Sequence, residues 1–259
     1  MTTQVTFEVT EAEREVADLL PVEAPVTACH EVLDTVPIWF HTFALNKRAG
    51  LYTPGLARDH RYRIPFLPAD FTGLDVLDVG TCDGFYAFLA EARGAARVLA
   101  VDNEQYCHMV RGRWGIEIAG GAGFRAMKGL LGSSVDYLRA NALDLVVTPK
   151  ERFDFIYCCG MLHRVPNPLG MLQVLRNLLR PEGRILLETY GVPEGHEDTP
   201  AIQVLSAGEA NPGDDVHYWG FGPRTLARLA EWARLTETGD TTMTTIDGHP
   251  RIIATLRAA

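Results

Sequence analysis

The sequence predicts an α/β fold in which a mostly parallel sheet carries helices on both faces. Three observations predict it. A short apolar run at residues 76–79 is followed by a break containing glycines and then by a helical pattern. A second run, residues 96–102, ends in an acid, and a third, residues 153–160, precedes an apolar helix at 169–179. Buried strands that alternate with amphipathic helices are typical of a parallel sheet covered on both sides.

The turn after the first predicted strand indicates a ligand site. Glycines let a backbone approach a ligand closely, and the following helix offers unpaired N–H groups. The spacing Gly80-x-x-x-Gly84 lacks the middle glycine of the dinucleotide fingerprint, since Cys82 stands there. Asp102 comes 18 residues after Gly84, near the distance at which an acid reaches ribose hydroxyls. A ribose without a diphosphate fits S-adenosylmethionine, although a strand, turn and helix without a ligand stays an alternative.

Residues 76–88 resemble motif I of the class I methyltransferases, and residues 98–102 resemble their motif II. The resemblance implies a Rossmann-like, seven-stranded sheet, S-adenosylmethionine as the methyl donor and S-adenosylhomocysteine as the product. In that family the turn after the third strand lies against adenine, which here assigns Asn141 and Ala142, with Asp144 as a capping alternative. The donor-binding residues that the resemblance implies are Asp78, Gly80, Asp83, Gly84, Asp102, Asn103, Asn141, Ala142 and Gly160.

Composition limits the remaining classes. The 259 residues, 47% of them hydrophobic, suffice for one large domain or for a domain with a cap. No run of 18 apolar residues and no signal segment is visible, and the five cysteines have no metal spacing. We therefore expect a cytoplasmic protein. The net charge of −9 disfavours a nucleic-acid partner, which needs a basic surface. The oligomeric state does not follow from the sequence.

The residues ahead of the predicted core read as a helical lid, residues 1–70, followed by a core of residues 71–259. Helices are predicted over residues 5–20 and 27–36. Residues 38–63 then gather aromatic, histidine and arginine side chains. The segments Trp39–Thr42, Thr53–Gly55 and Val79–Phe85 resemble one branch of the class I enzymes, and the similarity covers residues 36–190. That branch includes the enzyme that makes the oxyacetate form of the tRNA wobble uridine, together with natural-product relatives.

The branch implies a lid that closes over the active site, with Trp39, His41 and Tyr52 as lid candidates against packing roles in the cap. One departure concerns the donor. The tRNA enzyme holds a carboxylated donor with a lysine before the core and a tyrosine after strand four, and this chain has Arg61 and His163 at the aligned positions. Arg61 could still pair with a carboxylate. Without the tyrosine, ordinary S-adenosylmethionine is the expected donor.

The remaining segments continue the alternation of predicted helices and strands. A helix is predicted over residues 105–114 with a loop up to residue 128, then a strand followed by a turn within residues 133–144. After the helix at 169–179, residues 180–183 form a turn and residues 184–190 a strand. A helix over residues 225–235 follows, and residues 241–245 and 252–256 form a closing hairpin around Asp247-Gly248.

Residues 191–218 form a polar insertion on the substrate side. A loop of this length is usually functional or disordered. It concentrates carboxylates beside histidines and aromatic residues, and a solvated surface loop is the alternative. The substrate candidates of the whole chain are Trp39, Tyr52, Arg61, His196, Asp214, Asp215, Tyr218 and Trp219, and Glu197 and Asp198 add to the acidic character of the insertion. We expect no metal ion, since a solvated charge run explains these acids.

Methyl transfer is an in-line displacement at a sulfonium carbon, so the protein mainly aligns and desolvates its substrates. A hydroxyl acceptor needs a base, and the catalytic candidates are His163, His217 and His41. The predicted function is methyl transfer to O or N of a small polar metabolite, such as an antibiotic-type natural product or an amino-sugar precursor. A tRNA wobble-uridine modifying enzyme and a non-catalytic S-adenosylmethionine-binding module are the alternatives.

Overall fold

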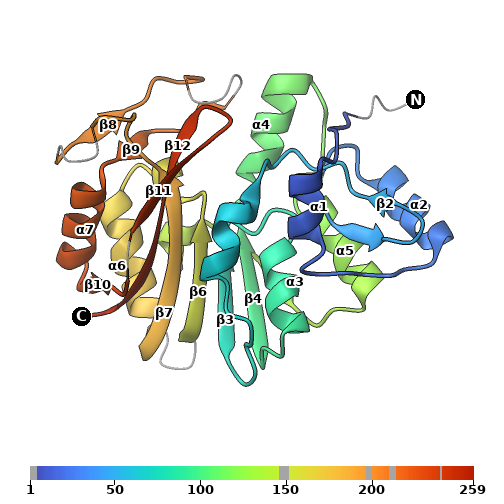
Figure 1. The fold of residues 1–259 in the computed structure, drawn as a ribbon, viewed down its shortest axis with the longest axis horizontal. Coiled ribbons are helices and arrows are strands. Elements are labelled where there is room, and N and C mark those ends of the chain that lie inside the picture. Colours follow the sequence, from blue (N-terminus) through green and yellow to red (C-terminus); the bar gives the residue numbers. More distant parts are fainter. Residues whose placement is uncertain (1–4, 146–151, 197–199, 210–213, 240) are drawn as a thin grey trace.

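A mixed sheet with helices on both faces forms the centre of the molecule (Figure 1). The computed structural model describes residues 5–145, 152–196, 200–209, 214–239 and 241–259. The described strands of the sheet follow the order β5-β4-β3-β6-β7-β12-β10, and β11 pairs with β12. They are β3 (Asp75–Val79), β4 (Arg97–Asp102), β5 (Asp136–Arg139), β6 (Phe153–Cys159), β7 (Leu179–Tyr190), β10 (Leu235–Glu237), β11 (Thr242–Ile246) and β12 (His249–Ala258). This arrangement confirms the predicted α/β fold with a seven-stranded Rossmann-like sheet.

The strand order reverses at β3. This strand pairs in parallel with β4 on one side and with β6 on the other, and the chain then extends outward in both directions, to β5 and to β7. β12 closes the sheet antiparallel to β7. In open α/β sheets, ligands bind outside the carboxyl ends of the strands at such a reversal. The topology therefore places a binding site beyond the ends of β3, β4 and β6.

Alternating residues of the central strands supply two hydrophobic cores. Val76 and Phe155 belong to the cluster formed with α3 and α5, whereas Leu77 and Ile156 belong to the cluster formed with α6 and α7. This alternation is the pleat of a strand buried on both faces. The helices are α3 (Phe85–Ala92), α4 (Gln105–Trp114), α5 (Ala122–Leu131), α6 (Pro168–Leu178) and α7 (Pro223–Trp232).

The segment before the core, which we call the cap (residues 5–70), packs into the first of these clusters. It contains α1 (Glu11–Ala17), α2 (Val26–Thr35), β1 (Ala44–Asn46), β2 (Leu51–Tyr52) and a short helix at His60–Phe66. The ring of Phe43 lies 5.4 Å from that of Phe85 on α3. Because cap and core share a cluster of buried side chains, the division into a lid of residues 1–70 and a core of 71–259 stays a prediction.

One carboxylate joins the cap to the glycine turn. Asp83 is 3% exposed, and its Oδ2 accepts hydrogen bonds from the backbone N–H groups of Phe40 (2.6 Å) and His41 (3.0 Å). Burial raises the pKa of Asp83 to about 7, although the two hydrogen bonds act to lower it. Gly123 on α5 is required beside it, since a Cβ there would lie 2.2 Å from the Asp83 carboxylate.

Three predicted elements differ from the structure. The helix predicted over residues 5–20 is limited to α1, because Thr10 and Glu13 form a capping box that begins the helix there. The predicted loop up to residue 128 is partly wrong, since α5 begins at Ala122, and glycines at both of its ends hid the helical pattern. The predicted turn at 180–183 is part of β7, where the register with β6 shifts.

The insertion and the hairpin have regular structure. In the insertion, β8 (Ile202–Val204) pairs antiparallel with β9 (Trp219–Phe221), and Glu197 and Asp198 lie outside the described residues. The closing hairpin is confirmed, and its turn residues Asp247 and Gly248 both have positive φ, as a two-residue turn of this kind requires. Within the described part of the chain, no helix is long and apolar enough to cross a membrane.

Replacing Asp83 by alanine is expected to destabilise the fold, because two buried N–H groups of the cap would lose their acceptor. The expected loss in the free energy of unfolding is about 1–3 kcal/mol, measured by denaturant titration. Asp83→Asn keeps an acceptor oxygen and should recover part of the loss. Asp136→Ala, at an exposed position of β5, is the control, with an expected change within about 0.5 kcal/mol. Equal stability of Asp83→Ala and the wild type would contradict the role of this carboxylate.

Candidate active site

A cavity of about 650 Å³ opens at the carboxyl ends of β3, β4 and β6. Its walls come from the strand ends and the turns after them, the cap, α4, the insertion after β7 and the β11–β12 hairpin. The volume lies in the range of sites that enclose small molecules. The strand reversal and the cavity therefore coincide.

Asp102, at the end of β4, lines this cavity and is 7% exposed. One of its oxygens accepts the backbone N–H of Cys82 at 2.7 Å, and the other accepts that of Glu104 at 2.6 Å. Burial raises the pKa of Asp102, and the two hydrogen bonds act against that rise. A carboxylate fixed in this way can accept hydrogen bonds from ribose hydroxyls, as the sequence predicts.

The two glycines of the turn have different surroundings. Gly80 lines the cavity with φ +79°, and a Cβ there would lie 2.3 Å from the sulfur of Met161. Gly84 is not among the lining residues. At φ +88°, its added Cβ would lie 2.6 Å from the rings of Phe88 and Phe124. Gly84 is therefore required for the packing of α3 against α5, and only Gly80 lies where a donor could contact it.

Asp78, at the end of β3, is a second buried carboxylate of the cavity wall and is 4% exposed. Its Oδ2 accepts the hydroxyl of Thr81 at 2.7 Å. Burial raises its pKa to about 7, and the Thr81 hydrogen bond counteracts part of the rise. A cation beside this carboxylate would favour its charged form. S-adenosylmethionine carries such a charge on its sulfonium and on its ammonium group.

The remaining predicted donor residues lie around the same end. Asn103, Asn141, Ala142 and Gly160 all line the cavity, at the ends of β4, β5 and β6. The side-chain oxygen of Asn141 accepts the backbone N–H of Leu143 at 3.0 Å, which leaves its amide NH₂ group for a ligand. Asp83 contacts the cap backbone instead and does not line this cavity.

Two of the predicted catalytic histidines, His163 and His217, lie together in the cavity wall. The rings of His163 and His217 stack at 4.8 Å with an interplanar angle of 17°. His217 Nδ1 lies 3.4 Å from Asp214 Oδ2, and the same oxygen accepts Arg164 Nη1 at 2.9 Å. Burial lowers the pKa of His217, against the opposing effect of Asp214. Burial raises the pKa of Asp214, but the His217 hydrogen bond and the Arg164 charge outweigh it and lower the value to about 2.

The Nδ1 atoms of these two histidines have different neighbours. The backbone N–H of Tyr190 points at His163 Nδ1 from 3.4 Å, and the hydroxyl of Thr189 lies 3.2 Å from the same atom. His163 Nδ1 is therefore an acceptor, and its proton is on Nε2. His217 Nδ1 faces the Asp214 carboxylate at 3.4 Å, which favours the tautomer with the proton on Nδ1.

His41, the third candidate, lies in the cap wall of the cavity and is 6% exposed. Burial, followed by the nearby charge of Arg63, lowers its pKa to about 3. Its ring is 5.8 Å from Tyr86 and 6.2 Å from His60. His41 is therefore neutral at physiological pH and belongs to an aromatic part of the cavity wall.

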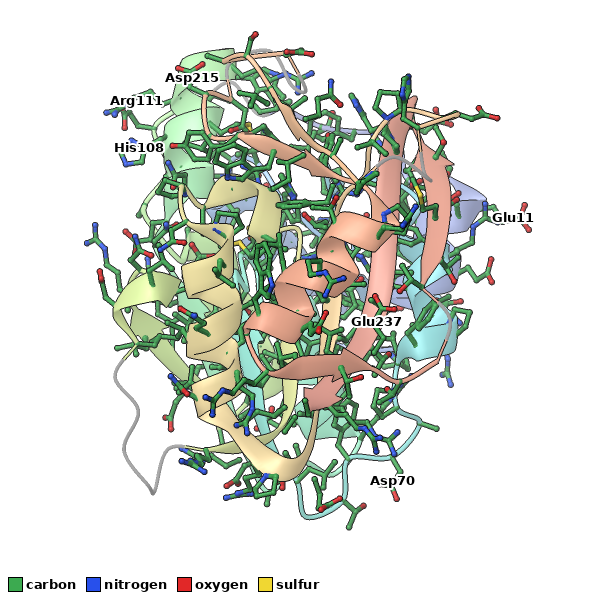
Figure 2. All side chains as sticks on the ribbon, turned by 90° about the vertical axis from the view of Figure 1, so that its left-hand side faces the viewer. Glu11, Asp70, His108, Arg111, Asp215 and Glu237 are labelled. Atoms are coloured by element: carbon green, nitrogen blue, oxygen red, sulfur yellow. The ribbon has the colours of Figure 1, made fainter. Side chains whose placement is uncertain are left out.

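Of the predicted substrate residues, only Asp214 and Tyr218 line the cavity. Trp39 is fully buried in the cap core, and Trp219 donates its indole N–H to the Val165 carbonyl at 2.8 Å. Arg61 pairs with Asp59 and Glu15 on the surface. Tyr52, His196 and Asp215 also lie outside the lining, and Figure 2 shows Asp215 at the outer surface.

Sequence reasoning missed a buried ion group in the cavity. Glu188 on β7 is completely buried, and it binds Arg63 of the cap and Arg251 of β12, both of which line the cavity. A lone acid in the apolar run Ile185–Thr189 was the available signal, since a buried carboxylate requires partners. Nothing local in the sequence marks Arg251. Among the described residues, no group of three or more His, Cys, Asp or Glu side chains could hold a metal ion.

The chain is similar to methyltransferases. A family model described as a methyltransferase domain matches residues 52–236. A tRNA U34 carboxymethyltransferase from Chromohalobacter salexigens is 30% identical over 90% of this chain and 74% of that protein. A ubiquinone biosynthesis O-methyltransferase from Xanthomonas oryzae pv. oryzae is 30% identical over 65% of this chain and 64% of that protein.

Coverage of the relatives varies. The chain spans 37% of the length of a tRNA U34 carboxymethyltransferase from Alteromonas mediterranea, at 32% identity. Among solved structures, the Burkholderia thailandensis 1,6-didemethyltoxoflavin-N1-methyltransferase, with bound 1,6-didemethyltoxoflavin and S-adenosylhomocysteine, has a TM-score of 0.55 and 21% identity. That similarity covers 73% of this chain and 72% of the other, and it shows a shared fold.

Asp102→Ala is expected to weaken the binding of S-adenosylmethionine, because the ribose would lose a buried charged acceptor. The expected cost is about 1.5–3 kcal/mol, or at least about tenfold in Kd, measured by calorimetry. Asp136→Ala, an exposed position on the neighbouring strand, should bind like the wild type. Wild-type affinity of Asp102→Ala would end the ribose assignment.

Donor binding is also expected to depend on pH through Asp78. Its pKa of about 7 means that the empty site holds a proton below pH 7, and a bound cation would expel it. Affinity should therefore rise with pH up to about 7, by at most about tenfold per unit, and then level off. Calorimetry between pH 5.5 and 7.5 measures this. In Asp78→Asn the slope should disappear, and an unchanged slope would exclude Asp78 as its source.

Proposed function

The chain belongs to the class I S-adenosylmethionine-dependent methyltransferases, and we propose that it methylates a hydroxyl group of a small molecule with His217 as the general base. The observation that carries the proposal is the contact between His217 and Asp214 in the cavity wall, at 3.4 Å. A buried carboxylate beside Nδ1 favours the tautomer with its lone pair on Nε2, and it stabilises the imidazolium that forms.

The reaction needs little from the protein beyond alignment and proton removal. The acceptor oxygen attacks the methyl carbon as its proton passes to His217 Nε2, and the carbon–sulfur bond breaks to release S-adenosylhomocysteine. The positive charge of the sulfonium disappears in this step, and a dry cavity favours that change. His217 is 2% exposed, in keeping with such a site. The lowered pKa keeps His217 neutral at pH 7 and thus able to accept a proton.

His163 has a different role in this proposal. Its Nδ1 accepts hydrogen bonds from the protein, and its pKa is lowered well below the usual value by burial and then by His217. A neutral ring stacked on His217 fixes the orientation of the base. Its backbone carbonyl also accepts the N–H of Tyr218 at 2.8 Å, which holds the insertion against the end of β6.

A small acceptor is supported by the state of the arginines that could otherwise contact tRNA. Arg58 pairs with Glu13, Arg61 with Asp59, and Arg111 with Glu117. Arg63 is buried on Glu188. Figure 2 shows Arg111 on the outer side of α4, beside His108. With acidic partners on each and a net charge of −9, these residues offer little free charge to a phosphate backbone.

The similarity to tRNA U34 carboxymethyltransferases keeps tRNA modification as the second candidate. We place the acceptor instead among small polar metabolites such as natural-product precursors. The purified protein is incubated with methyl-labelled donor and, separately, with a small-molecule extract and total tRNA of the host. Label in a small molecule supports the proposal. Label in tRNA favours the second candidate, and donor binding without any turnover favours a non-catalytic module.

Two adjacent acids give a matched test of the base. Asp214 is buried beside His217, whereas Asp215 is exposed. Asp214→Asn is expected to lower kcat at least about tenfold, and His217→Asn about a hundredfold or more, with donor affinity unchanged. Asp215→Asn should behave like the wild type. Turnover is measured as S-adenosylhomocysteine formed with the acceptor from the labelling survey.

The pH profile separates a base from a structural residue. In the wild type, kcat/KM should rise with pH through a pKa below 6.5, since burial lowers the pKa of His217. In Asp214→Asn this step should move to lower pH, because the carboxylate that raises the histidine pKa is gone. Reduced kcat with an unmoved profile would assign Asp214 to structure alone and would contradict the proposed base.

A further inference from the structure

The Glu188 group leaves one positive charge at the cavity wall. Its Oε2 accepts Arg63 Nη2 at 2.6 Å, and its Oε1 accepts Arg251 Nε at 2.6 Å. Glu188 is completely buried, and the two arginines lie between it and the cavity. Two guanidinium groups on one carboxylate carry a net charge of +1. A buried charge without a counter-charge is costly, so this wall is suited to an anion.

Each nitrogen of the Arg63 guanidinium has a partner within the protein. Its Nε bonds the Tyr62 hydroxyl at 3.3 Å, and its Nη1 bonds the Tyr86 hydroxyl at 3.2 Å. The same Nη1 lies 3.4 Å from His60 Nδ1, and Nη2 is bound to Glu188. Arg63 therefore holds the cap and Glu188 in place, and its guanidinium has its partners within the protein.

Arg251 differs in this respect. Only its Nε is bound to Glu188, and within the described part of the chain neither Nη1 nor Nη2 has a hydrogen-bond acceptor. Its side chain is 14% exposed and lines the cavity, with the guanidinium 4.4 Å from the Tyr190 ring centroid. Two adjacent N–H donors of a planar guanidinium match the two oxygens of a carboxylate.

The position of Arg251 relative to the proposed base restricts the acceptor. The ring of His217 lies 5.1 Å from the Tyr190 ring, so the base and the guanidinium flank the same aromatic side chain. An acceptor that reaches both groups therefore carries a hydroxyl and an anion in one small molecule. The ring of His249 lies 5.6 Å from that of Tyr190 and also lines the cavity, so it adds an aromatic side chain to this part of the wall.

We propose that Arg251 binds a carboxylate of the acceptor, and that the substrate is a hydroxy acid whose hydroxyl lies at His217. This inference rests on the proposed function, because it names the substrate class of that site. The acids of the insertion do not oppose an anionic substrate, since Asp214 is paired with Arg164 and Asp215 faces solvent.

The proposed substrate class is tested by measuring ligand binding in the absence of methyl transfer. The protein is saturated with S-adenosylhomocysteine, and 4-hydroxybenzoate, 4-hydroxybenzamide and 4-hydroxybenzylamine are titrated in by calorimetry. The three probes share a ring and a hydroxyl and differ in charge. The acid is expected to bind at least about tenfold more tightly than the amide, and the amine most weakly. Equal binding of acid and amide, tighter binding of the amine, or no binding of the acid at millimolar concentration would overturn the inference.

Variants of one strand assign the preference to its source. In Arg251→Gln the preference for acid over amide should fall to within about twofold, whereas Arg257→Gln, an exposed position of β12, should leave it intact. Thermal melting and S-adenosylhomocysteine affinity check that each variant is folded. Arg251→Lys keeps a charge for Glu188 but cannot offer two parallel donors, so it should lose at least about threefold of the preference even if Arg251→Gln does not fold. A preference that survives in Arg251→Lys and Arg251→Gln would contradict the assignment.

A carboxylate could also belong to the donor. The affinities of S-adenosylmethionine and of its carboxylated analogue are therefore compared in the wild type and in Arg251→Gln. If only the carboxylated donor is weakened, Arg251 serves the donor and the inference is wrong. Because none of these measurements needs methyl transfer, they are independent of His217. Anion binding without His217-dependent turnover would refute the proposed function alone, and turnover of a neutral alcohol would refute this inference alone.

Discussion

The structure around the cavity depends on the completely buried carboxylate of Glu188. It lies on β7 and binds one arginine from the cap and one from the closing hairpin, so a single side chain connects three parts of the chain. Removing one member of a buried ion group typically costs about 3–5 kcal/mol, since the remaining charge is left without a partner. The three members therefore stabilise the walls of the cavity together.

Asp83 supports the same enclosure from the other side. By accepting two backbone N–H groups of the cap, it fixes Phe40 and His41 over the glycine turn. The donor end and the acceptor end thus share walls whose positions are set by buried carboxylates. Such groups lose hydration on folding, and their hydrogen bonds offset that loss only with good geometry. Walls held by such hydrogen bonds suit a reaction that consists mainly of alignment.

Local patterns allowed much of the fold to be predicted, together with several residues that line the cavity. The strand, glycine turn and helix at residues 76–88, the acid at Asp102 and the closing hairpin each depend on neighbours in sequence. The ion group of Glu188 in the cavity wall was not predicted, because it is built from contacts between distant residues. Arg63 and Glu188 are 125 positions apart, and Glu188 and Arg251 are 63 apart. Asp214 and Asp215 are chemically identical neighbours, and only tertiary packing buries the first and exposes the second.

The reversal of strand order at β3 has a consequence for how such proteins diversify. The residues expected at the donor come mostly from β3, β4 and the turns that follow them, before residue 161, whereas the proposed base and the anion-binding arginine come from the insertion and β12. The expected donor site and the proposed acceptor groups therefore depend mostly on different parts of the sequence. Substitutions in the insertion and in β12 can therefore change the wall beside the proposed acceptor while the ends of β3 and β4 stay unchanged.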